Sequence, residues 1–155
     1  MTVTILLLAA AGANGLLTGA SLDQSVKQLP ARRRIGAVEF SRYSQAADLS
    51  NGVPWYVALG IGTAVLTLAA ALAGLVAQPT RPSGIALGVA LAATIAHSSA
   101  TARAAPINFR QRSMAGDEAA LADLFDRFER WQTFRATCQV LALIAVLTAL
   151  ATALP

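Results

Sequence analysis

Four long apolar segments constrain the fold of this chain more than any other feature. They run over about residues 3–20, 55–77, 84–105 and 136–154, and together they contain one charged residue, Arg103. An α-helix needs about 20 apolar residues to cross a bilayer. A backbone in lipid must also satisfy its own hydrogen bonds, so such segments form helices. We expect one all-α domain over residues 1–155, an integral membrane four-helix bundle with two polar, partly helical connections on one face.

The composition supports this expectation and excludes several classes of protein. Hydrophobic residues make up 55% of the 155 residues and charged residues 13%, about half the usual share of roughly 25%. Intrinsic disorder requires the opposite balance. The single cysteine, Cys138, and single histidine, His97, exclude a disulfide scaffold and a cysteine-based or multi-histidine metal site. We see no nucleotide-binding glycine-rich loop, and we expect neither a metal nor a cofactor.

The positive charge follows the connections between the apolar segments. The net charge is +4, and eleven of the twelve basic residues lie in or beside the first and third connections. They are Lys27, Arg32, Arg33, Arg34, Arg42, Arg103, Arg110, Arg112, Arg127, Arg130 and Arg135. The positive-inside rule then predicts a multi-pass protein of the cell membrane, with cytoplasmic connections and both termini outside. Membrane topology explains this charge better than a nucleic-acid partner does. No basic region precedes the first segment, so we expect a retained span rather than a signal peptide.

Short motifs indicate how the spans pack. The Pro-rich stretch 78–83 predicts a tight turn, which makes the second and third spans antiparallel neighbours. Gly15 with Gly19, and Gly84 with Gly88, form GxxxG pairs that allow close helix contact. We favour contact inside the monomer, and a homo-oligomer is the alternative.

The first connection begins as if the first span continued. Residues 21–29 keep a helical pattern, which we expect Pro30 to end. Asp23 and Lys27 are four residues apart and share a face. A polar stripe follows at helical spacing: Asn14, Thr18, Ser21 and Ser25. Polar groups in a membrane helix usually face the bundle interior or a water-filled cavity. We therefore take Asp23 as a candidate base and Asn14, Gln24 and Lys27 as candidate substrate contacts; alternatively, these groups only join helices.

Residues 35–49 form a short amphipathic stretch, which we expect to lie on the membrane interface or to fold back as a lid. Trp55 then stands at the start of the second span. An aromatic belt explains its position better than stacking on a substrate, although both readings are open.

The second long connection carries further candidates. His97 and Asn108 continue a helical spacing from the third span, and Asp117 is placed to cap a charged helix that runs into the fourth span. An imidazole titrates near neutral pH, so His97 could transfer a proton. A buried histidine satisfied by one hydrogen bond is the plainer interpretation. The acids of the charged helix are best explained as a solvated face.

Arg135 is the most suggestive single residue, because an arginine at the membrane boundary is costly unless it snorkels or is paired. A paired Arg135 would use Asp23, Glu39 or another acid, above a cavity. Gln132 and Gln139 share its helix face and are candidate substrate contacts. Cys138 is best explained by packing.

At this point the chain resembles a known family. Pro106, Ile107 and Asn108, then a charged helix, then Trp131 followed four residues later by Arg135, are similar to the anthrone-oxygenase-like family of small four-span membrane proteins. The similarity covers the topology and is sharpest over 104–145. It implies a cofactor-free oxidoreductase that converts polyketide anthrones to anthraquinones. Asn108, Trp131 and Arg135 are its candidate site residues.

The chain departs from that family at one position. Many relatives have histidine directly after the tryptophan, where this chain has Gln132, and glutamine cannot act as a base. His97 would have to replace it, or the chemistry differs. The same groups would suit an epoxide-opening hydrolase or cyclase, or an isomerase, of natural-product biosynthesis. A non-enzymatic lipophile-binding, transport or assembly protein is the third alternative. We expect a lipophilic small molecule and membrane lipid as partners.

Overall fold

The computed structural model describes residues 2–77 and 81–153, all but a few of which are helical. Residues 78–80 of the expected turn at 78–83 therefore lie outside the described residues, and residues 81–83 already belong to the next helix. The elements follow in chain order: α1 (Thr2–Leu22), η1 (Asp23–Gln28), α2 (Leu29–Ile35), α3 (Ala37–Ala46), η2 (Ala47–Asn51), α4 (Gly52–Ala77), α5 (Arg81–Phe109), η3 (Arg110–Ser113) and α6 (Glu118–Ala153). Here η1 and η2 are π-helical and η3 is a 3₁₀-helix.

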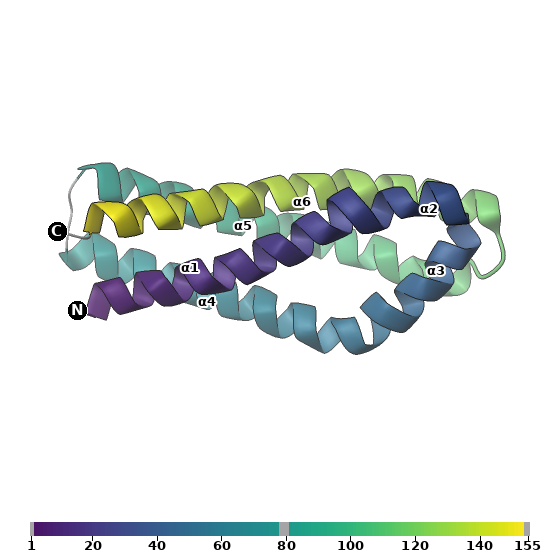
Figure 1. Ribbon diagram of the computed structural model, residues 1–155, viewed down its shortest axis with the longest axis horizontal. Coiled ribbons are helices and arrows are strands. Elements are labelled where there is room, and N and C mark those ends of the chain that lie inside the picture. The colour runs from purple at the N-terminus through teal and green to yellow at the C-terminus, as the bar shows by residue number, and fades with distance from the viewer. Residues whose placement is uncertain (1, 78–80, 154–155) are drawn as a thin grey trace.

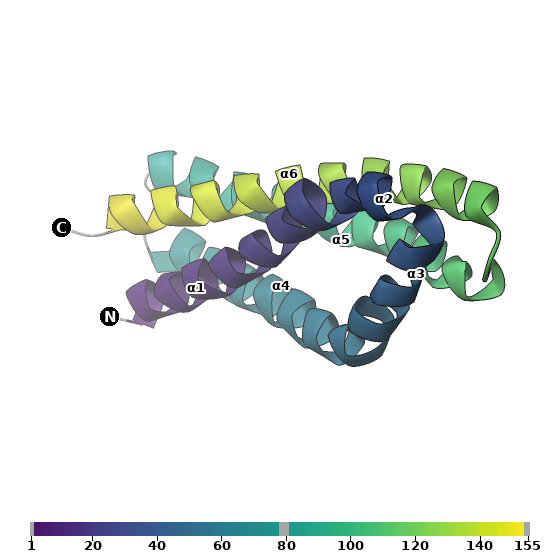
Figure 2. The same cartoon turned by 45° about the vertical axis from the view of Figure 1, so that its right-hand side comes forward.

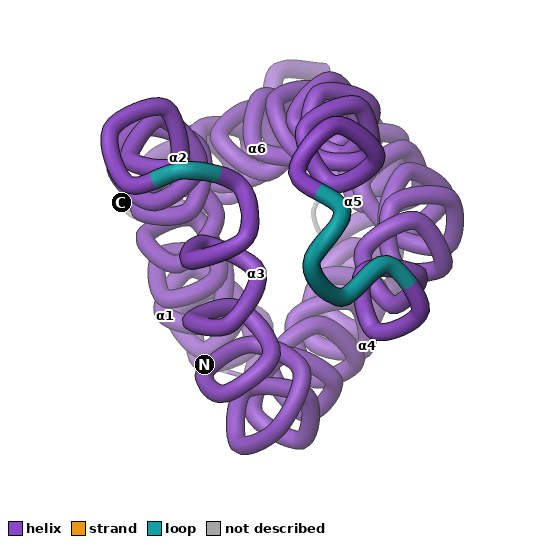
Figure 3. The backbone as a smooth tube through the Cα atoms, turned by 90° about the vertical axis from the view of Figure 1, so that its right-hand side faces the viewer, coloured by secondary structure: helices purple, strands orange, loops and turns teal. Residues whose placement is uncertain are grey.

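The four long helices run side by side along the molecule, and both chain ends lie at one end of it (Figure 1). Viewed along the long axis, α1, α4, α5 and α6 surround a common centre (Figure 3). The helices α2 and α3 occupy the end opposite the termini. Four helical stretches are each long and apolar enough to cross a membrane. The expectation of an all-α, multi-pass four-helix bundle is thus confirmed.

The helices extend well beyond the apolar segments that predicted them. The 36 residues of α6 measure about 54 Å at 1.5 Å per residue, whereas the hydrocarbon core of a bilayer is about 30 Å thick. Asp117 begins this helix as expected, because its Oδ1 accepts the backbone N–H of Ala120 at 3.0 Å.

The prediction that Pro30 ends the first helix is wrong. The chain stays helical to Ile35, because the π-helical turn η1 precedes α2 and puts Pro30 in the first turn of that helix. A proline is tolerated in the first turn of an α-helix, where the N–H groups make no i→i−4 bond within that helix. The chain then bends at Gly36, whose φ of 88° favours glycine.

The core has three layers along the bundle. Near the termini the helices pack through small and aliphatic side chains such as Leu7, Ala71, Leu87 and Val146. At the other end α2 and α3 pack on α5 and α6 around Phe125. Between them lies a buried polar layer, described below.

The GxxxG pairs do not mediate close contacts inside the monomer, contrary to the interpretation favoured above. A Cβ added at Gly15, Gly19 or Gly88 would meet nothing within 4 Å, and one at Gly84 would only touch Leu75. Close packing occurs instead at Gly74, where an added Cβ would lie 2.7 Å from the Leu87 side chain.

Candidate active site

A cavity of about 390 Å³ lies inside the bundle, in the half that carries α2 and α3. Here α4 diverges from α6, as Figures 1 and 2 show. Its apolar lining comes mainly from α1 and α4: Leu17, Ala20, Val53, Val57, Gly60, Ile61 and Ala64. Its polar lining comes from every part of the wall: Ser21, Gln24, Asp48, Tyr56, His97, Ser98, Thr101, Asn108 and Arg135. The cavity therefore combines a largely apolar surface with several polar groups.

The two π-helical turns supply part of the polar lining. Gln24 belongs to η1 and Asp48 to η2, and both side chains are buried. A π-helical turn adds a residue to the helix and so turns its side chains away from the regular helical face. Such turns are frequent at functional sites.

Arg135 enters the cavity from the middle of α6. Its Nη2 donates to Gln24 Oε1 at 3.1 Å, and its buried Nε has no hydrogen-bond partner. Within the described residues no carboxylate lies within 4.0 Å of it. The acids expected as partners pair elsewhere, because Asp23 binds Lys27 and Glu39 binds Arg42. Arg135 thus presents a guanidinium to a mostly apolar cavity without a direct ion pair, and Asp48 of the same lining acts on it only through space.

His97 lines the cavity from α5, and its backbone contact fixes its tautomer. His97 Nδ1 lies 3.1 Å from the carbonyl oxygen of Arg135. A carbonyl oxygen only accepts hydrogen bonds, so Nδ1 carries the proton in the neutral ring. Nε2 is then the unprotonated nitrogen, and it makes no hydrogen bond to any residue that the structure describes. A histidine in this state is available as a proton acceptor.

Asn108 lines the same cavity and is held from behind by Gln111, whose Nε2 donates to Asn108 Oδ1 at 2.8 Å. Asp48 accepts from Ser44 Oγ at 3.0 Å. Of the eight acids, Asp48 alone is in the cavity lining. Residue spacing in the sequence did not single out Asp48, Tyr56 or Gln111.

Other candidates from the sequence lie outside the cavity. Asp23 and Lys27 form a partly exposed ion pair. Trp131 packs under Arg103, whose guanidinium carbon is 5.2 Å from the ring centre. Trp55 is 55% exposed, as a residue of an aromatic belt would be.

Three buried amides join helices. Asn14 Nδ2 donates to Thr67 Oγ1 at 2.9 Å, and Gln139 Nε2 donates to Asn14 Oδ1 at 2.8 Å, which links α1, α4 and α6. Gln132 Nε2 donates to the Ser21 carbonyl oxygen at 3.1 Å. These contacts fit the alternative weighed above, in which such groups hold helices together.

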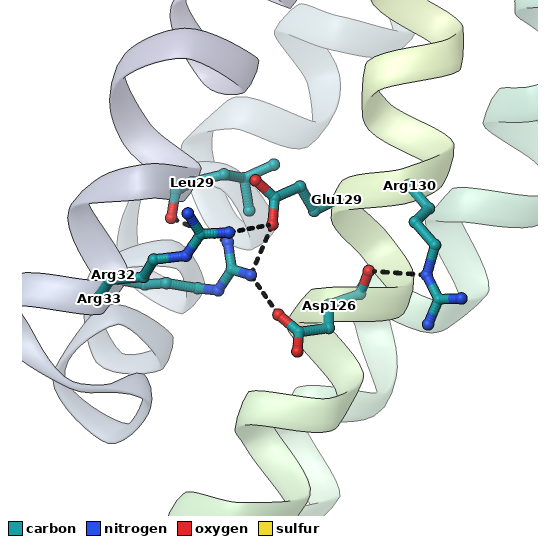
Figure 4. A network of polar contacts seen from close by, with 6 residues as sticks. All are labelled: Leu29, Arg32, Arg33, Asp126, Glu129 and Arg130. Atoms are coloured by element: carbon teal, nitrogen blue, oxygen red, sulfur yellow. Dashed lines mark hydrogen bonds and ion pairs between the residues drawn. The ribbon is translucent and has the colours of Figure 1, made fainter.

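The helices α2 and α3 are fastened over the end of the bundle by charged groups. Arg32, only 5% exposed, bonds to Asp126 and to Glu129 of α6, and Arg33 also reaches Glu129 (Figure 4). Glu118 accepts the backbone N–H groups of Ala37 at 2.5 Å and Val38 at 3.0 Å, which caps α3 from another helix. The stretch expected as an interfacial or lid segment is therefore a helix docked on the bundle.

These features define a class of protein: a multi-pass membrane bundle with a largely apolar cavity whose lining includes an arginine, a histidine, an amide and a carboxyl group. Among the described residues, no three His, Cys, Asp or Glu side chains gather as metal ligands would. Comparison with models of known families, with curated proteins and with solved structures found no match.

Proposed function

We propose that the protein is a membrane-embedded enzyme that ionises a lipophilic, polyketide- or quinol-like substrate, with anthrone oxygenation as the reaction. One observation carries the proposal: Arg135, which makes no ion pair, and His97, whose Nε2 is unprotonated, line one cavity. A buried cation without a partner is costly in a membrane protein. A substrate that becomes an anion in the cavity would compensate that cost. Abstraction of a proton from a neutral substrate produces such an anion.

Each cavity residue has a role in this reaction. His97 Nε2 takes the proton from the activated carbon of the anthrone, and Arg135 with Asn108 stabilises the negative oxygen that develops. The electron-rich carbanion then reacts with molecular oxygen. One oxygen atom becomes the new carbonyl of the anthraquinone and the other leaves as water, so that O2 is the oxidant and no cofactor takes part in the balance.

The position of the cavity supports entry from lipid. Its lining includes exposed residues on two neighbouring helices, Val57 and Ile61 on α4 and Ser98 and Phe109 on α5. An opening between α4 and α5 would let an apolar molecule enter sideways. We further propose that the end with α2 and α3 faces the cytoplasm of the cell, with both termini outside, because the basic connections lie at that end.

Epoxide opening is the second candidate, and Asp48 is the observation that favours it. A carboxyl group, the Tyr56 ring and a histidine whose Nε2 is unprotonated all belong to the cavity lining. Asp48 could activate a water or an internal hydroxyl, and Tyr56 could protonate the epoxide oxygen.

Isotope labelling separates these reactions. Membranes containing the protein are given 1,8-dihydroxyanthrone under ¹⁸O2 and, separately, in H2¹⁸O, and products are followed by mass spectrometry against membranes without the protein. We expect label from the gas, and a loss of about 100-fold in the catalysed rate for Arg135→Gln, the magnitude typical for an oxyanion-stabilising group. Arg103→Gln is the matched control, because Arg103 is exposed and lies outside the cavity.

The remaining outcomes decide against oxygenation. If an epoxide substrate gives a product labelled from water, and Asp48→Asn abolishes that labelling, the reaction is epoxide opening and not oxygenation. Binding of anthrones without any turnover above background would leave a lipophile-binding or transport protein.

A further inference from the structure

Asn108 lines the cavity, and its side chain is hydrogen-bonded by Gln111, which is buried and does not line the cavity. Gln111 is fully buried, and its Nε2 lies 3.0 Å from the backbone carbonyl oxygen of Asn108 and 2.8 Å from Asn108 Oδ1. The backbone carbonyl can only accept, so the Gln111 atom beside it must be the amide nitrogen. That nitrogen can only donate, so Asn108 must present its oxygen to Gln111.

The rest of the network agrees with this orientation. Ser41 Oγ donates to Gln111 Oε1 at 2.9 Å, the far side of the same amide. Gln111 Nε2 also lies 3.3 Å from Ser44 Oγ, which therefore accepts there and gives its one hydrogen to Asp48 Oδ2. The Gln111 amide and the two serine hydroxyls thus each donate to an acceptor, as buried polar groups require.

The side of Asn108 that is left for the cavity is its amide nitrogen. Asn108 Oδ1 accepts from Gln111, and Asn108 Nδ2, with its two hydrogens, makes no hydrogen bond to any described residue. Asn108 lines the cavity that Arg135 also enters. We propose that Gln111 is a positioning residue: it holds Asn108 as a hydrogen-bond donor toward the cavity, where Asn108 donates to an oxygen of an anionic, lipophilic ligand whose charge Arg135 attracts.

This inference deepens the proposed function and rests on the same cavity, but it is a statement about binding. It can therefore be tested with a ligand that cannot react. Two fluorescent tricyclic probes of nearly equal shape serve, 9-anthracenecarboxylate and its neutral carboxamide. Both are titrated into the purified full-length protein in detergent, and the ratio of the two affinities is the readout. A purely structural role of Gln111 would change both affinities together.

We expect the wild type to prefer the carboxylate. Gln111→Met removes the donor that holds Asn108, and we expect it to weaken carboxylate binding about tenfold, the scale of one hydrogen bond to a charged group, with carboxamide binding within about twofold of wild type. Gln45→Met is the matched control, because Gln45 donates to Ser41 Oγ in the same network without contacting Asn108. It should leave the ratio unchanged.

A double-mutant cycle completes the test. In an Asn108→Ala background, Gln111→Met should have no further effect on carboxylate binding, because there is no amide left to orient. Additive effects, an equal loss of both probes, or a wild type that does not favour the carboxylate would each overturn the inference.

If Gln111→Met does not fold, Asn108→Asp replaces it, since it keeps an acceptor for Gln111 but presents an oxygen to the cavity. Selective binding without turnover of 1,8-dihydroxyanthrone would refute the proposed function alone.

Discussion

His97 shows how one hydrogen bond can decide the chemistry of a residue. The Arg135 carbonyl keeps the proton on Nδ1 and leaves Nε2 as the basic atom. The interaction also joins α5 to α6 next to the guanidinium that, in the proposed reaction, would stabilise the anion formed by deprotonation. A histidine with no such contact could adopt either tautomer and would spend only part of its time in the useful one.

We expect His97→Gln to lower the catalysed oxidation of 1,8-dihydroxyanthrone by at least about 100-fold, the usual contribution of a general base. Glutamine can still donate to the Arg135 carbonyl but has no basic nitrogen, so the fold should persist. The checks are the initial rate above background and the thermal midpoint of the purified protein. An unchanged rate in a folded variant would show that another group removes the proton.

Residue spacing predicted part of the site and missed the rest for a physical reason. His97, Asn108 and Arg135 lie on regular α-helix, where a rotation of about 100° per residue fixes which side chains share a face, and the structure brings these three to one cavity. Gln24, a candidate from the sequence, also lines the cavity. Asp48 lies in the π-helical turn η2, which the sequence pattern does not reveal. Gln111 acts through a buried network between distant segments, so no local pattern marks it.

At the scale of elements, α4 forms the apolar wall of the cavity, and its glycines keep that wall open. A Cβ at Gly60 or at Gly62 would meet nothing within 4 Å, but only Gly60 lines the cavity. A larger side chain at Gly60 can therefore extend into the cavity without a steric clash at its base.

We expect Gly60→Leu to fill part of the cavity and to weaken binding of both anthracene probes by tenfold or more. Gly62→Leu should bind them as the wild type does, and both variants should fold, because leucine favours a helix over glycine by up to about 1 kcal/mol. Fluorescence titration measures the affinities. Equal binding by the two variants would mean that the probes bind elsewhere.

The charged contacts of α2 form the second element-scale feature. Arg32 is nearly buried between Asp126 and Glu129, whereas the Arg42 pair with Glu39 is exposed and local. Exposed pairs contribute little, but removing one partner of a buried pair is costly because it leaves charge without compensation.

We therefore expect Arg32→Met to loosen α2 and α3 from α6. Amide hydrogen exchange over residues 29–46 should become at least about tenfold faster, while α6 beyond residue 138 keeps its protection. Arg42→Met is the control and should exchange like the wild type. Unchanged exchange over 29–46 in Arg32→Met would show that Glu118 and the contacts around Phe125 hold these helices without Arg32.

At the scale of the whole molecule, chemistry is divided along the long axis. The half near the termini packs through aliphatic and small side chains, while the opposite half holds the cavity, the buried networks and the docked helices. Hydropathy alone predicted four crossings and placed both long connections at one end. It could not predict the cavity, which arises because α4 diverges from its neighbours as it approaches η2 and α3.

This division predicts how the protein sits in its membrane. Arg42 in α3 and Ser113 in η3 are exposed and belong to the two basic connections, so both should face the same side, and the positive-inside rule makes it the cytoplasm. Arg42→Cys and Ser113→Cys, each in a Cys138→Ala background, are tested with a membrane-impermeant maleimide. We expect labelling in inside-out vesicles and none in intact cells. The wild-type chain is the control, because its single cysteine, Cys138, is buried and should stay unlabelled. Labelling of the two sites from opposite sides would contradict the four-span topology, and labelling of both in intact cells would invert the orientation while leaving the bundle intact.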